Sequence, residues 1–117
     1  MPPIKKTPKD SLTILTDTVL PGETNAINNL FGGELLARMD RAAAISAKRH
    51  SKQFVVTSSV NNVSFGMPIP LGSTVTIEAK VSRAFNSSME VYIDVWIDNS
   101  IGAVSYTHLT LPTILPV

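Results

Sequence analysis

Residues 33–49 read GELLARMDRAAAISAKR, and this stretch decides the fold class of the chain. It is rich in strong helix formers and has no proline, so it predicts a helix of about 25 Å at 1.5 Å per residue. Glu34 and Arg38 are spaced as an i,i+4 ion pair. The predicted outer face carries Glu34, Arg38, Arg41 and Lys48, and the predicted inner face carries Leu36, Met39, Ala43 and Ala47, flanked by Leu35, Ala42 and Ala44. So many alanines would let a sheet pack close to the helix axis.

Strands are predicted on both sides of this helix. The β-branched run Ser11–Leu20 (SLTILTDTVL) precedes it and stops at Pro21-Gly22, and Phe54–Phe65 (FVVTSSVNNVSF) follows it. Two further strands, Val75–Val81 and Met89–Asp98, alternate apolar and polar residues with period two. The order β-α-β-β-β predicts an α+β domain in which one antiparallel sheet wraps a single central helix. The open sheet edges favour pairing with a partner.

The composition indicates one globular domain without a strong attraction for charged partners. The chain has 117 residues, of which 44% are hydrophobic and 16% charged, and its formal net charge is +1. No run of Lys or Arg is interleaved with aromatic residues, which argues against nucleic acid as a partner. No apolar run approaches the roughly 18 residues of a membrane span, and the N-terminus lacks the apolar core of a signal peptide. We therefore expect a cytoplasmic protein.

Both ends of the chain are predicted to lie outside the domain, which is placed at residues 11–102. Residues 1–10 (MPPIKKTPKD) carry three prolines and three lysines with little to bury, so they are interpreted as a disordered leader. Residues 103–117 are interpreted as a non-native tail, because all nineteen charged residues precede Asn99.

The coding sequence implied by the tail supports this interpretation. Val104–Thr113 (VSYTHLTLPT) back-translates without mismatch to gtc tct tat aca cat ctg acg ctg ccg acg, the end of a transposase-based sequencing-library adapter. Read-through of this kind would leave the last strand of the sheet missing or replaced. Tyr106 and His108 therefore receive no functional weight.

Few side chains offer chemistry on their own. The chain has no cysteine, which excludes disulfides, thiolate metal sites and cysteine nucleophiles. His50 falls at the predicted helix C-terminus, where capping or solvation explains it. Ser58, Ser59 and Ser64 have no visible His-acid partners, so a serine triad has no support. No metal and no organic cofactor is predicted.

Asp40 is the acidic residue that needs an explanation. Its helix neighbours at i−4, i−3, i+3 and i+4 are Leu36, Ala37, Ala43 and Ala44. We therefore expect it on the apolar side of the helix, without a basic partner at that spacing. An acid in such surroundings is shifted toward accepting a proton near neutral pH, as a general base does. The alternative, which the sequence leaves open, is an Asp that hydrogen-bonds a neighbouring loop or a second subunit.

The loop before the predicted helix contains Asn25, Asn28 and Asn29 and ends in FGG at residues 31–33. Two glycines at a helix start permit close approach of a ligand, and the helix N-terminus offers free N–H groups and the positive end of its dipole. This geometry suits a polarised carbonyl oxygen. The alternative interpretation of Gly-Gly is an ordinary turn.

Together these features resemble the hotdog-fold acyl-coenzyme A thioesterases, the YciA-like and eukaryotic acyl-CoA hydrolase group. The resemblance covers about residues 12–98 and is carried by TN, FGG, MD, VVT, PLG and SSMEV at fixed spacing. It implies an enzyme that hydrolyses acyl-CoA to a free acid and coenzyme A, built as a homodimer or a multiple of dimers. A non-catalytic hotdog module that binds acyl-CoA or only dimerises, and a thioesterase acting on acyl-carrier protein, are the alternatives.

The resemblance also implies roles for individual residues. Asp40, at the MD position, would be the general base or nucleophile, and a helix amide near Gly33 would stabilise the oxyanion. Asn25 would orient the water or the carbonyl from the opposite subunit. The implied substrate-binding residues are Phe31, Gly32, Arg83, Ser87 and Ser88, the last three near the coenzyme A phosphates. Gly66-Met67 departs from the bulkier residues common at that point, which leaves the shape of the acyl pocket open.

Overall fold

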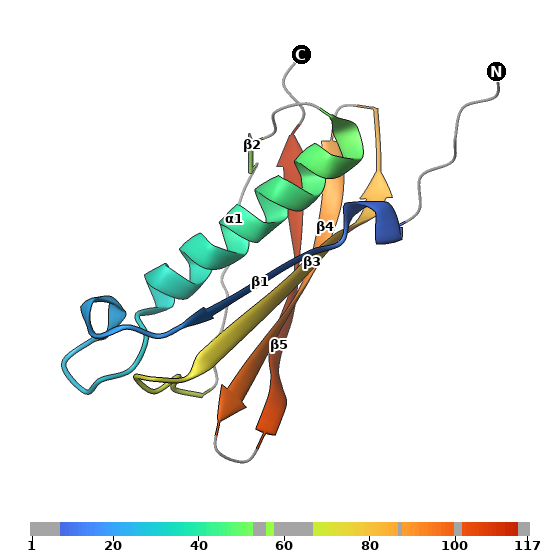
Figure 1. Ribbon diagram of the computed structural model, residues 1–117. Coiled ribbons are helices and arrows are strands. Elements are labelled where there is room, and N and C mark those ends of the chain that lie inside the picture. Colours follow the sequence, from blue (N-terminus) through green and yellow to red (C-terminus); the bar gives the residue numbers. More distant parts are fainter. Residues whose placement is uncertain (1–7, 53–55, 58–66, 87, 100–101, 115–117) are drawn as a thin grey trace.

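The computed structural model describes residues 8–52, 56–57, 67–86, 88–99 and 102–114. One long helix and an antiparallel sheet make up most of this part (Figure 1). The strands are β1 (Thr13–Thr18), β2 (Val56–Thr57), β3 (Thr74–Ala84), β4 (Ser88–Asn99) and β5 (Gly102–Ile114). The helices are α1 (Gly32–Ser51) and two short 3₁₀ helices, η1 (Pro8–Ser11) and η2 (Pro21–Glu23). The predicted α+β class is confirmed.

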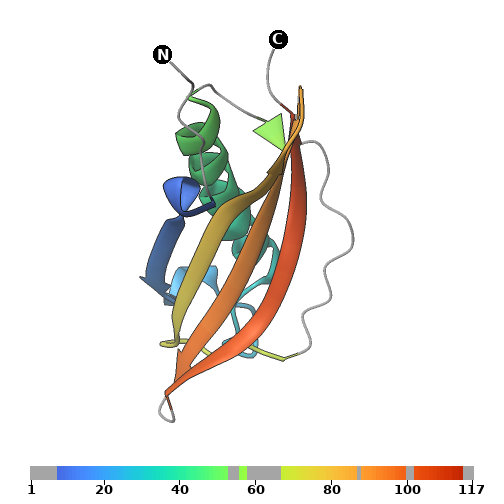
Figure 2. The ribbon, with the colours of Figure 1, turned by 90° about the vertical axis from the view of Figure 1, so that its right-hand side faces the viewer.

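The described strands form one sheet in the order β1-β3-β4-β5-β2, and every neighbouring pair is antiparallel. α1 crosses one face of this sheet, and the view turned by 90° shows the long strands curving past it (Figure 2). A sheet wrapped around one central helix is the hotdog arrangement that the sequence predicts. The outermost strands of the sheet are β1 and β2.

The core lies between α1 and the apolar face predicted from the alternation of β3 and β4. Cross-strand pairs such as Ile77 with Val95 and Ala79 with Ile93 place these side chains on the same face. All the apolar residues of this face are at most 7% exposed: Val75, Ile77, Ala79, Val81, Met89, Val91, Ile93, Val95 and Ile97. Removal of this apolar surface from water is the main force that holds the helix on the sheet.

α1 buries a stripe that differs in part from the predicted one. The buried residues are Leu35, Arg38, Met39, Ala42, Ala43, Ser46 and Ala47, whereas Leu36 and Ala44 are half-buried. The predicted Glu34–Arg38 ion pair is wrong, because Arg38 pairs with Glu23 instead. The stripe is centred on Met39, and Arg38 lies only about 100° around the helix from it. The stem of Arg38 therefore packs beside β1 while its charged end reaches Glu23.

The N-terminal segment joins the fold earlier than predicted. Residues 1–7 of the expected leader lie outside the described residues, but Pro8–Ser11 form η1 and Ser11 is fully buried. The Ser11 hydroxyl accepts a hydrogen bond from Val81 N at 2.8 Å, and its carbonyl accepts one from Ser46 Oγ at 2.9 Å. The end of the predicted leader, residues 8–10, is therefore part of the folded domain.

The strand predicted over residues 54–65 is described only at Val56–Thr57, where β2 pairs with β5. Residues 53–55 and 58–66 lie outside the described residues. Near the C-terminus, the last strand of the sheet was expected to be missing or replaced. The segment Gly102–Ile114 takes the position of that strand as β5, which pairs with β4 from Asn99↔Gly102 to Ser88↔Ile114. Period-two alternation and backbone hydrogen bonding suffice to add a strand to a sheet. The non-native origin of this segment stays a prediction.

Candidate functional site

The start of α1 presents backbone donors to its surroundings. Phe31 is the N-cap residue and its side chain makes no capping hydrogen bond, while Gly32 and Gly33 are exposed. The first N–H groups of a helix have no intrahelical partner, and the helix dipole adds to their attraction for an oxygen atom. A Cβ added at Gly33 would meet no atom within 4 Å. The space beside this amide is therefore open to a carbonyl oxygen.

Asp40 lies on the same flank of α1 as Gly33. Seven residues at about 100° each return the side chain almost to the same side, about 10 Å further along the axis. Asp40 is exposed in the single chain, so the predicted burial among apolar side chains is wrong. The buried stripe is centred on Met39, and Asp40 is turned about 100° away from it. Its neighbours Ala37 and Ala44 are too small to cover it.

The spacing between Gly33 and Asp40 suits a small reacting group. Helix side chains lean toward the N-terminus, so the Asp40 carboxylate lies over the turn before its own Cα. This lean makes the carboxylate lie closer to the Gly33 amide than the rise of about 10 Å between the two residues. A carbonyl held at Gly33 and a water molecule held by Asp40 would lie on the same flank of α1.

Asn25 lies in a loop that its own side chain holds in shape. Its Oδ1 accepts hydrogen bonds from the backbone N–H groups of Ile27 and Asn29, both at 3.1 Å. The Nδ2 of the same amide carries two N–H donors, which these two hydrogen bonds do not use. Figure 1 shows the loop beyond the N-terminal end of α1. The Asn25 side chain therefore keeps Nδ2 as a donor, while its oxygen is engaged inside the loop.

The structure places two of the predicted phosphate contacts, Arg83 and Ser88, at the other end of the helix. Arg83 is exposed and Ser88 is half-buried, beside the β3–β4 turn in which Phe85 N donates to Ser88 O at 2.8 Å. Figure 1 shows this turn near the C-terminal end of α1. From Asp40 to Ser51 the helix rises about 16 Å. Ser87 lies outside the described residues. Phe31 is 50% exposed and lies next to Gly32, at the end opposite Arg83.

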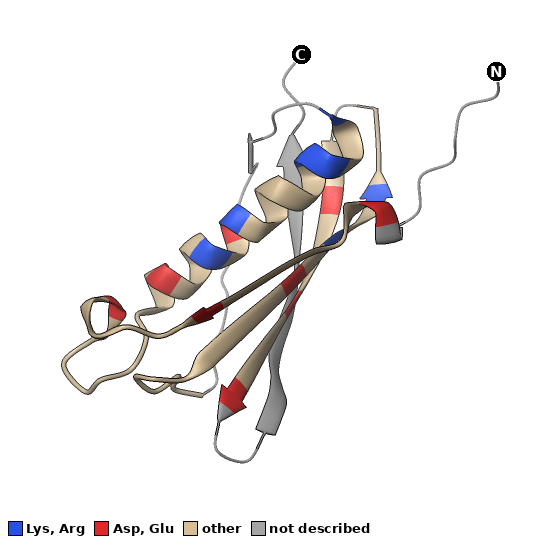
Figure 3. Cartoon of the chain, in the orientation of Figure 1, with Lys and Arg blue, Asp and Glu red and all other residues tan. Residues whose placement is uncertain are grey.

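Charged residues lie along α1, with both acidic residues, Glu34 and Asp40, in its N-terminal half and basic residues in its last turn (Figure 3). A backbone hydrogen bond from Leu20 and then the Arg38 guanidinium hold the pKa of Glu23 below its usual range.

Among the residues that the structure describes, no group of three or more His, Cys, Asp or Glu could hold a metal ion. No helix of the described part is long and apolar enough to cross a membrane.

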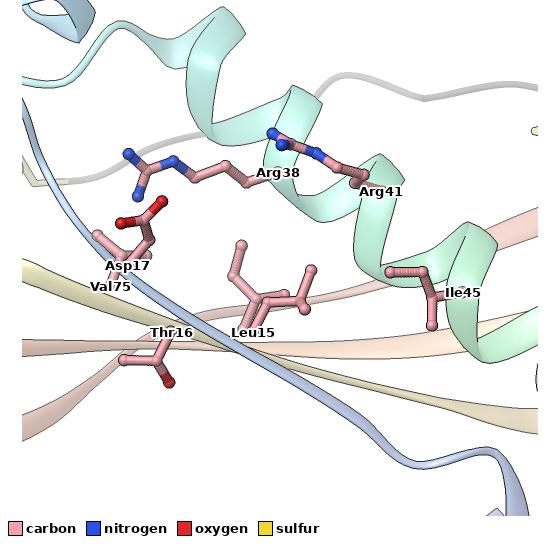
Figure 4. A pocket seen from close by; sticks show the side chains of 8 residues that line it. Leu15, Thr16, Asp17, Arg38, Arg41, Ile45 and Val75 are labelled. Carbon is pink, nitrogen blue, oxygen red and sulfur yellow. The ribbon is translucent and has the colours of Figure 1, made fainter.

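A cavity of about 250 Å³ lies between α1 and β1 (Figure 4). Its lining consists of Leu15, Thr16, Asp17, Arg38, Arg41, Ile45, Val75 and Ile77. Sequence reasoning missed it, because the cavity depends on Arg38 turning toward β1. Around α1, Arg38, Arg41 and Ile45 point about 160°, 100° and 140° away from Asp40, so the cavity lies on a different side of the helix from the candidate site.

Comparisons with known proteins agree on one family. The model of the thioesterase superfamily matches residues 27–103. Over 87 residues the chain is 41% identical to an uncharacterized acyl-CoA thioester hydrolase of Bacillus subtilis, covering 74% of this chain and 51% of that protein. The chain thus spans about half the length of this relative.

Two solved structures are similar over most of the chain. An asparagine-to-alanine variant of the acyl-CoA hydrolase from Staphylococcus aureus, in complex with coenzyme A, has a TM-score of 0.89 at 32% identity, and the match covers 96% of this chain and 68% of that chain. Variants of this hydrolase carry alanine in place of an asparagine, an aspartate and a threonine, spaced by 15 and then 17 residues. A hexameric thioesterase from Yersinia pestis has a TM-score of 0.81 at 28% identity and covers 90% and 87%.

Proposed function

Because this chain belongs to the thioesterase superfamily, we propose that the protein hydrolyses acyl-CoA thioesters to a free acid and coenzyme A. The Staphylococcus aureus relative is an acyl-CoA hydrolase with coenzyme A bound. The Bacillus subtilis relative is named for the same activity. An open helix start and an accessible carboxylate on one flank of α1 fit this chemistry.

The observation that carries the proposal is the spacing of three residues. Asn25, Asp40 and Thr57 stand 15 and then 17 residues apart, as do the asparagine, aspartate and threonine replaced in the Staphylococcus aureus enzyme. Sequence reasoning singled out the first two and gave Thr57 no role. The only signal for Thr57 was its place in the VVT motif of the predicted strand Phe54–Phe65, of which the structure describes β2 (Val56–Thr57). We add Thr57 to the proposed site on the ground of this spacing.

In the proposed reaction the thioester carbonyl is held between the start of α1 and Asp40. Asp40 takes a proton from water as the water oxygen bonds to the carbonyl carbon, and the N–H near Gly33 and the Nδ2 of Asn25 donate to the developing oxyanion. Collapse of the intermediate breaks the C–S bond, and the proton on Asp40 passes to the departing thiolate. A general base contributes about 10² to 10⁴ in rate.

Assembly into a homodimer or a multiple of dimers is part of the proposal. In the single chain Asp40 is exposed, and the Asn25 loop lies beyond the helix end. A second copy packed on the Asp40 flank would exclude water from the carboxylate and bring its own Asn25 to the site. The hexameric state of the Yersinia pestis thioesterase supports such an assembly. The cytoplasmic location stays a prediction.

The coenzyme would run along α1 from the reacting thioester. We propose that Arg83, with Ser87 and Ser88, binds its phosphates at the far end. The rise of about 16 Å from Asp40 to the end of α1 is a span that only an elongated ligand could bridge. The positive charge of Arg83 is exposed there for phosphate oxygens.

A thiol-release assay over a series of acyl-CoA chain lengths tests the function. The wild-type chain is expected to release coenzyme A, and Asp40→Asn is expected to lose turnover while keeping acyl-CoA affinity. Binding of acyl-CoA without turnover in the wild type would instead support the non-catalytic module. Faster turnover of the same acyl group on carrier protein would move the substrate class to acyl-carrier protein.

A further inference from the structure

One ion pair connects the Asn25 loop to the helix that carries Asp40. Glu23 stands two residues before Asn25, and Arg38 stands two residues before Asp40. Arg38 Nη2 lies 3.0 Å from Glu23 Oε1, and the side chains are 7% and 26% exposed. The same Nη2 donates to Thr18 O at 3.3 Å. The guanidinium is therefore enclosed where η2, the end of β1 and α1 meet.

Glu23 is in turn built into the backbone of the loop. Its Oε1 also accepts a hydrogen bond from Leu20 N at 3.0 Å, and its carbonyl accepts one from Phe31 N at 3.0 Å. Phe31 is the N-cap residue of α1. Asn25 N donates to Asn29 O at 2.8 Å within the same loop. A shift of Glu23 would therefore move both ends of the segment that contains Asn25.

We propose that the Arg38–Glu23 ion pair is a positioning device that fixes the Asn25 amide at the catalytic site. In the proposed assembly this Asn25 serves the Asp40 of a second copy. The Arg38 guanidinium is engaged by Glu23 Oε1 and Thr18 O of its own chain, so Arg38 acts on the site through the loop. The inference rests on the proposed function, in which Asn25 Nδ2 donates to the thioester oxygen. A misplacement of such a group by about 1 Å is enough to lower the rate about 10²-fold.

A double-mutant cycle between Arg38 and Asn25 tests the inference in the full chain. Arg38→Met keeps the apolar stem and the helix propensity but removes the charge, and it is expected to lower kcat about 10- to 100-fold. Asn25→Ala alone is expected to lower kcat at least as much. If Arg38 acts through Asn25, the double variant has nearly the kcat of Asn25→Ala alone. Arg38→Lys, which keeps the charge, is expected to restore part of the rate.

Arg41→Met is the matched control, since Arg41 is an exposed arginine one turn further along the same helix. Its kcat is expected to stay near that of the wild type. A wild-type kcat in Arg38→Met, or losses that multiply in the double variant, would overturn the inference. Thermal unfolding of each variant shows whether it is folded at the assay temperature.

If Arg38→Met does not fold, Glu23→Gln takes its place in the cycle. Glutamine retains an oxygen for Leu20 N but removes the charge that faces Arg38. The same non-additivity with Asn25→Ala is expected, and multiplicative losses would again overturn the inference. An inactive wild type would refute the proposed function. An active wild type with multiplicative losses would refute only the positioning role.

Discussion

Replacement of Gly33 by alanine is expected to raise stability while lowering activity. Gly33 is helical, and a Cβ at this position meets no atom within 4 Å. Alanine is favoured over glycine inside a helix by about 0.5–1 kcal/mol. At the smaller value, suited to a first turn, the melting temperature would rise by about 2–3 °C in a domain of this size.

The same methyl group would stand where the proposed mechanism holds the thioester oxygen. Loss of one oxyanion donor lowers kcat by about 10² to 10³ in other hydrolases, and we expect a fall in kcat/KM of about 10²-fold. Thermal unfolding followed by circular dichroism and a thiol-release assay measure the two effects on the same sample.

Gly22→Ala is the control for Gly33→Ala, because a Cβ at Gly22 also meets no atom within 4 Å and Gly22 lies in η2. It is expected to leave kcat/KM unchanged. Full activity in Gly33→Ala, together with a raised melting temperature, would refute the approach of the carbonyl to this amide. A lowered melting temperature would show that the space around Gly33 is not open in the assembled protein, and would indicate that a second copy fills it.

Asp40→Asn is expected to lower kcat by about 10²- to 10⁴-fold with little change in acyl-CoA affinity, and unchanged thiol release would remove Asp40 from the chemistry. Gly72→Ala is expected to destabilise the fold by about 1–2 kcal/mol despite open space around it, because Gly72 has φ +89°; denaturant unfolding measures this. The pKa of Glu23 is lowered from 4.5. The stabilisation of the fold by the Glu23 carboxylate is therefore present above about pH 4.5, and it is lost as the pH falls through the pKa that Glu23 has in the folded protein. The difference in free energy of unfolding between wild type and Glu23→Gln should therefore shrink below about pH 4.5, and a constant difference would contradict the role of this carboxylate.

The fold was predictable because its elements have strong and separate patterns. Alternation places Val75, Ile77, Val91 and Ile93 on one face, and the structure buries all four. The alanine-rich run forms α1 within two residues of the predicted ends, Gly33 and Arg49. Such patterns report which side of an element meets the core, and tertiary packing agrees with them here.

The candidate site was less predictable because it depends on contacts distant in sequence. Helical spacing favoured Glu34 as the partner of Arg38, but Glu23 lies closer once η2 folds back beside α1. The apolar neighbours of Asp40 in sequence do not cover it in space, since the sheet packs on the adjacent face. A one-residue difference in position turns a helical side chain by about 100°. Periodicity alone does not resolve which edge of a stripe is covered.

The amide of Asn25 divides two tasks between its two terminal atoms. The oxygen closes the loop through Ile27 N and Asn29 N, whereas the nitrogen donates to the substrate in the proposed mechanism. An aspartate at this position would still accept both backbone hydrogens, but it would have nothing to donate. A variant with aspartate at position 25 would therefore be soluble and well expressed, and its defect would be detected only when turnover is measured.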